Sequence, residues 1–310
     1  MMKQLLLLGA AAAFIAPAMA ETEWMTDLPA AQERAAAEGK AVLADFTGSD
    51  WCGWCIRLRK NVFDTPEFEA YAADKFVLLE IDVPRNPNFD QDLLARNREL
   101  CDRYAIDGFP TVLVLTPQGQ TAGGFVGGLP DLAAVSAPLD AGAENARAYT
   151  EALAMEDGPE KAATLFKVYN NIPVGLRNKA TALRDSIMAM DAEDTTGIHG
   201  IVAAQQQKAA LNAEIRAAQD IPAMLAVIDK YLPEAAAENR GAMLNLKAQL
   251  LLSAAETEED VAAAKAVALE AAECEPETAA ENKAAIERAF ADPAALLERA
   301  RQYRERRNNK

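Results

Sequence analysis

Two cysteines three residues apart, Cys52 and Cys55, are the side chains in this sequence best suited to chemistry. They lie in the segment Trp-Cys-Gly-Trp-Cys, which follows a short apolar run and opens a predicted helix. The first thiol is then at a helix N-terminus, where unpaired N–H groups and the helix dipole favour the thiolate. Cys52 is therefore predicted to attack disulfides as a nucleophile. Cys55 is predicted to attack the resulting mixed disulfide and release the partner as a thiol.

Zinc binding and a purely structural disulfide are the alternatives for this pair. A zinc site needs two further ligands, and Cys101, Cys274, His199 and the carboxylates stand at scattered positions. A structural bridge that closes so short a loop restrains little chain entropy. No metal site is therefore predicted, and Cys101 and Cys274 are interpreted as buried, inert thiols on helices. His199, flanked by Gly197 and Gly200, is interpreted as a loop residue.

The apolar runs of the first half predict the elements that position this motif. Each run is short and bounded by turn residues, as buried strands are; the predicted strands are 41–46, 76–82, 111–115 and a segment ending at residue 125. A turn at 117–120 joins the last two strands as a hairpin. Helices are predicted at 52–60, at 66–73, and from a polar, proline-bearing insertion (84–90) to about residue 104. Asp131 opens a further helix, which Pro138 is expected to interrupt.

Three separated landmarks give the first half a resemblance to a known family. They are Asp45-Phe46, the segment from Trp51 to Cys55, and Gly108-Phe109-Pro110-Thr111. Together they look like a thioredoxin-fold protein, over about residues 24 to 137. The segment F-T-G-S-D-W-C-G-W-C (46–55) most resembles that of extracytoplasmic thioredoxin-like proteins.

The resemblance implies a role for the landmarks outside the cysteine pair. Pro110 would be a cis proline facing the pair, with Phe109 and Thr111 beside it contacting the substrate chain. Asp45 would be the buried carboxylate behind Cys55 that helps to take its proton. Burial supports that role, because desolvation raises the pKa of a carboxyl towards neutrality. A hydrogen-bonding aspartate and an ordinary trans proline are the alternatives at these two positions.

The residues that flank the cysteines complete the predicted substrate-contacting set. Trp51 is expected to be partly packed and partly on the rim, Trp54 to be exposed and able to press on a partner, and Gly53 to lie between them. The sequence differs from thioredoxin at two places: the turn before Trp51 is one residue longer, and Trp54 stands where thioredoxin has proline. Residues between the cysteines tune the redox balance, so the second difference leaves the direction of electron flow open.

The first twenty residues have the pattern of a cleaved signal peptide. Lys3 gives a positive start, Leu5 to Ile15 is an apolar run relieved only by small residues, and Ala18-Met19-Ala20 is an A-x-A cleavage site. An uncleaved anchor is the alternative. The pattern predicts a periplasmic or secreted protein, in a compartment where disulfides persist. No later stretch is apolar over a membrane-spanning length, so no span is expected in the mature chain.

An all-helical second half is predicted beyond about residue 141. Alanine-rich segments there carry helical stripes, and helix starts are marked at Gly158-Pro159, Asp220 and Thr257 with Asp260. Two architectures are compatible with this pattern: helical hairpins that faintly resemble tetratricopeptide repeats, and a plain helical bundle.

Three parts are therefore predicted for the chain. They are a signal peptide (1–20), an α/β thioredoxin-like domain with a central mixed sheet flanked by helices (21–140), and an all-α helical-hairpin or bundle domain (141–310). Pro138 and Gly142 are taken as marks of the boundary between the last two.

The composition excludes some classes of function. The 310 residues are 51% hydrophobic, enough for a packed core, and contain 31 Lys and Arg against 47 Asp and Glu, a formal charge of −16. This charge disfavours binding to nucleic acid and to anionic lipid. With a single histidine and four cysteines, no metal or organic cofactor is expected besides the redox-active Cys52–Cys55 disulfide.

The sequence thus predicts an extracytoplasmic thiol-disulfide oxidoreductase that exchanges disulfides with protein thiols and disulfides. An electron donor or acceptor, unidentified by the sequence, would restore the pair. Reductase is favoured over oxidase or isomerase by the thioredoxin-like Trp-Cys-Gly start. The helical half would dock a partner or a second copy. The alternative is a non-enzymatic binding protein, in which the helical half recruits partners and the cysteine pair is only structural.

Overall fold

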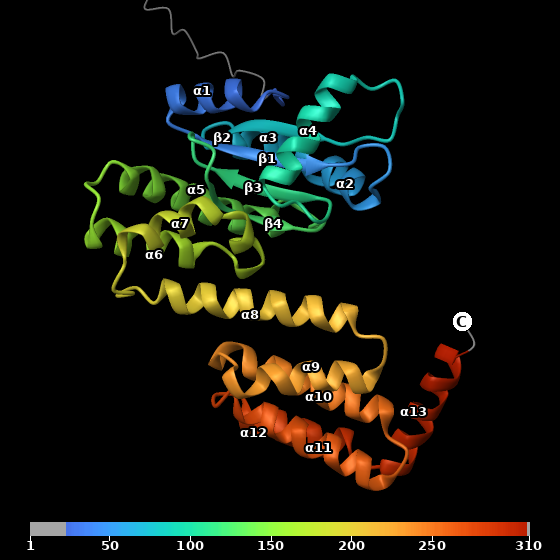
Figure 1. Cartoon of the computed structure of the whole chain (residues 1–310). Helices are drawn as coiled ribbons and strands as arrows, with labels where there is room; N and C mark the ends of the chain where they lie inside the picture. Colours follow the sequence, from blue (N-terminus) through green and yellow to red (C-terminus); the bar gives the residue numbers. More distant parts are fainter. Residues whose placement is uncertain (1–22, 309–310) are drawn as a thin grey trace, which may run out of the picture. The chain divides into compact units, whose positions relative to one another are not determined.

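A computed structural model describes residues 23–308 of the chain (Figure 1). The chain forms two compact units. The first ends at Thr196 and the second begins at Gly197. The predicted signal peptide, 1–20, lies outside the described residues. Among the described helices, none is long and apolar enough to cross a membrane.

A four-stranded mixed sheet is the centre of the first unit. Its order is β2-β1-β3-β4, with β1 parallel to β2 and antiparallel to β3, and β3 antiparallel to β4. The strands are β1 (Ala41–Thr47), β2 (Phe76–Asp82), β3 (Thr111–Leu115) and β4 (Thr121–Val126). All four predicted strands are present, and β1 extends one residue past its predicted end, to Thr47. The β3–β4 hairpin turns at Gly119, whose φ of 85° suits glycine.

Helices cover both faces of this sheet. The helices of the first unit are α1 (Leu28–Glu38), α2 (Gly53–Leu58), η1 (Arg59–Phe63), α3 (Pro66–Ala72), α4 (Gln91–Arg103), α5 (Leu132–Leu153), α6 (Pro159–Asn171), η2 (Val174–Lys179) and α7 (Thr181–Met190). One core unites Leu43 of β1 with Leu58 of α2, Phe68 of α3 and Leu139 of α5. The opposite face is covered by α1 and α4. This arrangement confirms the predicted thioredoxin-like α/β layers.

Strand periodicity assigns the side chains of β1 to these two layers. Successive side chains of a strand point to opposite faces, so Asp45 lies on the same face as Leu43. That face is the one covered by α2, η1, α3 and α5. Asp45 therefore points into the layer that contains the cysteine-bearing helix.

Helix α5 differs from the prediction, because Pro138 lies inside it and does not interrupt it. Proline removes one N–H from the helix ladder. The helix continues through Pro138 because residues on both sides of it are packed: Val135 and Leu139 are both fully buried in the core against the sheet. Gly142 also lies within α5, where its Cα closely approaches Gly123 of β4.

The division of the chain falls later than the predicted boundary at 140, which lies inside α5. The helices that follow are anchored to the sheet: the Asn145 side-chain amide donates to the carbonyls of Ala122 (2.7 Å) and Val168 (2.9 Å). The Thr121 hydroxyl donates to the carbonyl of Lys179 at 2.9 Å. Residues 141–196 therefore belong to the same compact unit as the sheet.

The second unit is helical throughout its described residues. It consists of α8 (Ile198–Ala217), α9 (Ile221–Tyr231), η3 (Leu232–Glu234), α10 (Ala237–Ala254), α11 (Glu258–Glu273), α12 (Ala279–Ala289) and α13 (Pro293–Asn308). Asp220 caps α9, and Thr257 with Asp260 forms the predicted capping box of α11. Helices α8 to α12 each pack against the next, and α13 packs on α10 and α11. The all-helical prediction is confirmed.

Candidate active site

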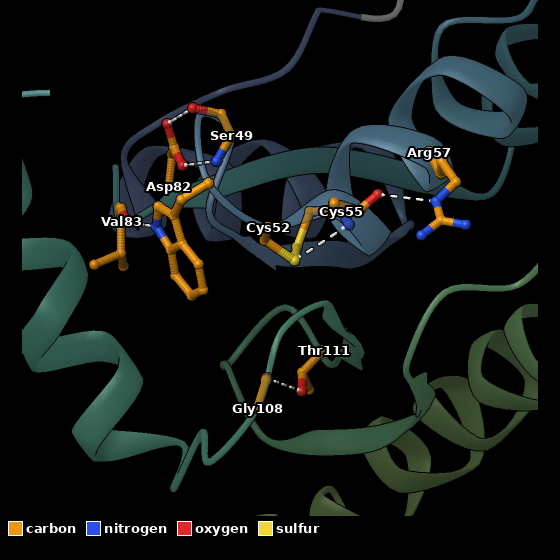
Figure 2. The surroundings of a disulfide bond; sticks show 10 residues. Ser49, Cys52, Cys55, Arg57, Asp82, Val83, Gly108 and Thr111 are labelled. Carbon is orange, nitrogen blue, oxygen red and sulfur yellow. Dashed lines mark hydrogen bonds between the residues drawn. A yellow bond between two sulfur atoms is a disulfide. The ribbon is translucent and has the colours of Figure 1, made fainter. Parts of the chain in front are cut away.

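Cys52 and Cys55 form a disulfide at the start of α2, with their Cα atoms 5.2 Å apart (Figure 2). Cys52 is the N-cap residue of the helix, and its Sγ accepts a hydrogen bond from the Cys55 N–H at 3.2 Å. Its own N–H donates to the carbonyl of Gly48 at 2.9 Å, which closes the turn after β1. The backbone thus points one N–H group, that of Cys55, at the sulfur of Cys52.

Neither cysteine is open to solvent in this disulfide form. Cys52 is 7% exposed and Cys55 3%. Both cysteines are therefore buried in the oxidised chain. The exposed group of the motif is Trp54, at 56%, as predicted.

The two tryptophans beside the cysteines have different surroundings. Trp51 donates its indole N–H to the carbonyl of Val83 at 2.8 Å and meets the ring of Phe109 edge-on, with centroids 5.6 Å apart. Trp54 carries the guanidinium of Arg57 over its ring at 4.1 Å. Trp51 is thus a half-buried packing residue that links two loops, whereas Trp54 presents an indole and a cation to the solvent.

A second loop lies across from the disulfide, from Gly108 to Thr111 (Figure 2). The Phe109–Pro110 peptide bond is cis, as the resemblance implies. The Thr111 hydroxyl donates to the carbonyl of Gly108 at 2.8 Å, and the Pro110 carbonyl accepts from the N–H of Gly127 at 2.8 Å. The Trp51–Phe109 contact joins this loop to the turn that carries Cys52.

Asp45 is a buried carboxyl on the central strand, 3% exposed. One of its oxygens, Oδ1, has no hydrogen-bond partner among the described residues. Burial raises its pKa to about 7; the positive charge of Arg59 opposes this rise, and the negative charge of Asp82 adds to it. A group with that pKa can accept or give up a proton near neutrality.

The end of β2 and the polar insertion after it contact the turn that precedes Cys52. Asp50 accepts hydrogen bonds from the N–H groups of Arg85 and Asn86, and Asp82 accepts from the N–H and the hydroxyl of Ser49. The guanidinium of Arg85 lies 4.7 Å from the centre of the Trp51 ring. The sequence marked residues 84–90 only as polar and proline-bearing. These contacts place Arg85 and Asn86 of that segment beside the motif.

Residues 23–117 match a family described as thioredoxin-like. This segment is a thioredoxin-like domain. Its match ends within the β3–β4 turn, so β4 and everything from α5 onward lie outside it.

Curated relatives match short parts of the chain. The disulfide bond reductase DsbH of Chlamydia pneumoniae is 30% identical over 90 residues, which are 29% of this chain and 54% of that protein. The thioredoxin-related protein DsbJ of the same organism is 28% identical over 93 residues, 30% of this chain and 27% of that protein. The thiol:disulfide interchange protein DsbD 2 of Pseudomonas aeruginosa is 36% identical over 86 residues, 28% and 13% respectively.

The chain spans about half the length of the first of these relatives and less of the other two. A solved structure described as a DsbH oxidoreductase covers 44% of this chain and 95% of its own, with 25% identity and a TM-score of 0.37.

The remaining cysteines and the histidine lie outside the thioredoxin-like motif. Cys101 on α4 and Cys274 at the end of α11 are half-buried, not fully buried as expected. Burial still raises the pKa of the Cys101 thiol to about 11. His199 is in the first turn of α8, not in a loop, because the left-handed Gly197 (φ 80°) begins that helix.

No group of three or more metal-binding side chains occurs within residues 23–308. The absence of a cofactor stays a prediction from the sequence.

Proposed function

We propose that this chain is an extracytoplasmic thiol-disulfide oxidoreductase that reduces protein disulfides through Cys52 and Cys55. The observation that carries the proposal is the disulfide itself, with Cys52 as the N-cap of α2 and its sulfur accepting the Cys55 N–H. Negative charge on that sulfur is stabilised by this donor and by the dipole of the helical segment. A merely structural bridge needs no such arrangement.

The reaction proceeds in two exchanges. In the reduced chain the Cys52 thiolate attacks one sulfur of a substrate disulfide, forming a mixed disulfide and releasing one substrate thiolate. Cys55 then loses its proton and attacks Cys52 Sγ, which forms the Cys52–Cys55 bond and releases the second substrate thiolate. Two electrons pass from the pair to the substrate, and both released thiolates take up protons. A dithiol donor of another protein restores the reduced pair by the reverse steps.

Asp45 is proposed to accept the proton of Cys55. It points into the layer of the sheet that α2 covers, where Cys55 and Leu58 share the buried face of that helix. Its pKa of about 7 suits proton transfer at neutral pH. An aspartate that only satisfied backbone donors would not leave Oδ1 without a partner.

The second loop is proposed to receive the substrate chain. The loop from Gly108 to Thr111, which contains the cis Phe109–Pro110 bond, lies across from the disulfide. Trp51 packs against Phe109, and Trp54 is exposed. Gly53 has open space around its Cα, which leaves the loop between the cysteines accessible to a partner.

The direction and the compartment rest on different observations. The name of the relative DsbH, a disulfide bond reductase, supports reduction, as does the Trp-Cys-Gly start of the motif. The residue pattern of 1–20 supports a periplasmic or secreted location. Docking of a partner or a second copy by the second unit remains part of this proposal.

Alkylation and insulin reduction test the proposal together. In the reduced full chain, limiting iodoacetamide at pH 6 should label Cys52 first, and Cys101 last because burial raises its pKa to about 11. The chain should reduce insulin with dithiothreitol as donor, and Cys52→Ser should abolish this activity. Cys101→Ser is the matched control and should leave it unchanged. A chain that labels Cys101 or Cys274 first, or that does not reduce insulin, contradicts the proposal.

A further inference from the structure

A buried lysine from beyond the thioredoxin-like segment reaches the loop that carries Pro110. Lys179 is the last residue of η2, and its side chain is only 1% exposed. Its ammonium donates to the carbonyl of Ala105 at 2.6 Å and to Oδ1 of Asp107 at 3.3 Å. A buried ammonium is costly unless it is hydrogen-bonded and paired, and here it has both kinds of partner.

The contact falls where the chain leaves α4 and enters the loop of residues 105–110. Ala105 has a φ of 50°, in the left-handed region that non-glycine residues seldom adopt. The N–H of Ile106 donates back to the carbonyl of Cys101 at 2.8 Å, which closes the end of the helix. The lysine thus places a positive charge at the C-terminal end of α4, where the helix dipole favours it.

Side-chain hydrogen bonds therefore hold this loop at both ends. Lys179 holds Ala105 and Asp107 at its start, and Thr111 holds the carbonyl of Gly108 at its far end. The lysine is itself fixed, because its carbonyl accepts the buried hydroxyl of Thr121, the first residue of β4. The backbone that carries this side chain is therefore hydrogen-bonded to the sheet.

We propose that Lys179 is a positioning residue of the redox site. By anchoring residues 105–107, it sets where Phe109 and cis-Pro110 lie relative to the cysteine pair, and so how a substrate chain is received. The segment after α5 is then part of the active unit and not a separate attachment. This inference rests on the proposed function, since the loop matters for substrate only if the pair exchanges disulfides.

The chain contains a matched control for this role. Lys161, on α6, is also a buried lysine, with a side chain 10% exposed. Its ammonium donates to the carbonyls of Leu153 and Met155 and to Asp157, at the α5–α6 connection. Lysine-to-methionine substitution removes the same kind of hydrogen bonds at both sites, but only Lys179 contacts the 105–110 loop.

The test compares Lys179→Met with Lys161→Met in the full chain, using insulin and a small aromatic disulfide, 5,5′-dithiobis(2-nitrobenzoate), as substrates. Lys179→Met should raise KM for insulin roughly five- to tenfold with little change in kcat, because the loss of a charged hydrogen bond weakens substrate positioning and not the thiol chemistry. Its rate with the small disulfide should stay within about twofold of wild type. Lys161→Met should leave both rates unchanged, and Lys179→Arg should restore part of the insulin KM.

A second measurement follows the loop without relying on activity. Hydrogen–deuterium exchange of the amides of residues 106–109 should be faster in Lys179→Met than in Lys161→Met. If Lys179→Met does not fold, Thr121→Val replaces it: this variant frees the lysine carbonyl and should shift the insulin KM and the loop exchange in the same direction.

The outcomes separate the two proposals. A wild-type chain that reduces neither substrate refutes the proposed function. A chain that reduces both, but whose Lys179→Met and Lys161→Met variants have the same insulin KM and the same loop exchange, refutes the positioning role. A similar loss on both substrates also refutes it, because it would place the effect in the thiol chemistry.

Discussion

Replacing Asp45 with asparagine should change the pH dependence of stability in a way that the structure specifies. Burial raises the pKa of this carboxyl from its ordinary 3.8 to about 7 in the folded state. Between those two pH values the folded chain holds a proton that the unfolded chain has lost. The free energy of unfolding therefore falls as the pH rises from about 4 to 7, and the loss persists above pH 7.

The size of this effect follows from the two pKa values. Each tenfold change in proton affinity is about 1.4 kcal/mol. Holding Asp45 ionised at pH 8 therefore costs the folded state about 4 kcal/mol relative to pH 4. Asp45→Asn removes the titration and keeps the shape of the side chain. Any unpaired amide in the variant adds a cost of about 1–3 kcal/mol, and that cost is the same at every pH.

The expected signature is the difference between variant and wild type as a function of pH. The free energy of unfolding of Asp45→Asn minus that of wild type should rise by about 4 kcal/mol between pH 4 and pH 8, measured by urea unfolding of the oxidised chain. Tryptophan fluorescence isolates the first unit, because the three tryptophans, Trp24, Trp51 and Trp54, all lie in it. The control is Asp74→Asn, which makes the same substitution at an exposed position of the same unit.

If the difference in free energy of unfolding between Asp45→Asn and wild type does not change with pH, the raised pKa is refuted and, with it, the role of this group as a base. The kinetic counterpart uses stopped-flow measurement of mixed-disulfide resolution. Asp45→Asn should slow that step near neutral pH, where Cys55 depends on a nearby proton acceptor. Unchanged resolution from pH 6 to 9 would remove Asp45 from the mechanism.

Three further outcomes are expected. Cys55→Ser should accumulate mixed disulfides with substrate proteins, visible on non-reducing gels, and Cys52→Ser should accumulate none, because only the former leaves an attacking thiol without its resolving partner. A fragment of residues 21–196 should fold and reduce insulin, whereas 21–140 should lose cooperative unfolding, since it ends inside α5 and leaves β4 without its helical cover. Gly142→Ala should destabilise the first unit by about 1–3 kcal/mol by urea unfolding, because its Cβ would lie 2.8 Å from Val114; Gly175→Ala, which meets nothing within 4 Å, is its control.

The motif and the sheet could be predicted because their signals are local. Each strand is an apolar run that ends at a turn, and β2 and β3 begin and end at the predicted residues. The position of Cys52 before a helix follows from the same logic. Its burial could not be predicted, because the exposure of Cys52 depends on the packing around the disulfide and not on the motif alone.

The boundary at 140 illustrates a signal that has two meanings. Pro138 and Gly142 punctuate a sequence in the same way at a domain boundary and inside a packed helix. Here Pro138 is held by the burial of its neighbours, and Gly142 has no side chain because β3 and β4 pass too close to allow one. Only the sheet, folded against α5, distinguishes the two meanings.

Lys179 shows why the positioning of a site is harder to predict than its chemistry. The spacing of the cysteine pair predicts its reaction from the sequence alone. A lysine in a helical region gives no such signal, because its side chain normally extends into solvent. Its partners, Ala105 and Asp107, lie more than seventy residues earlier, and an alanine carries no signal that its carbonyl needs a donor. Lys161 has the same chemistry in the same region and contacts a different connection. Which of the two lysines bears on the redox site is decided by the path of the chain from α5 to η2, so the function of this segment follows from its packing and not from its residue types.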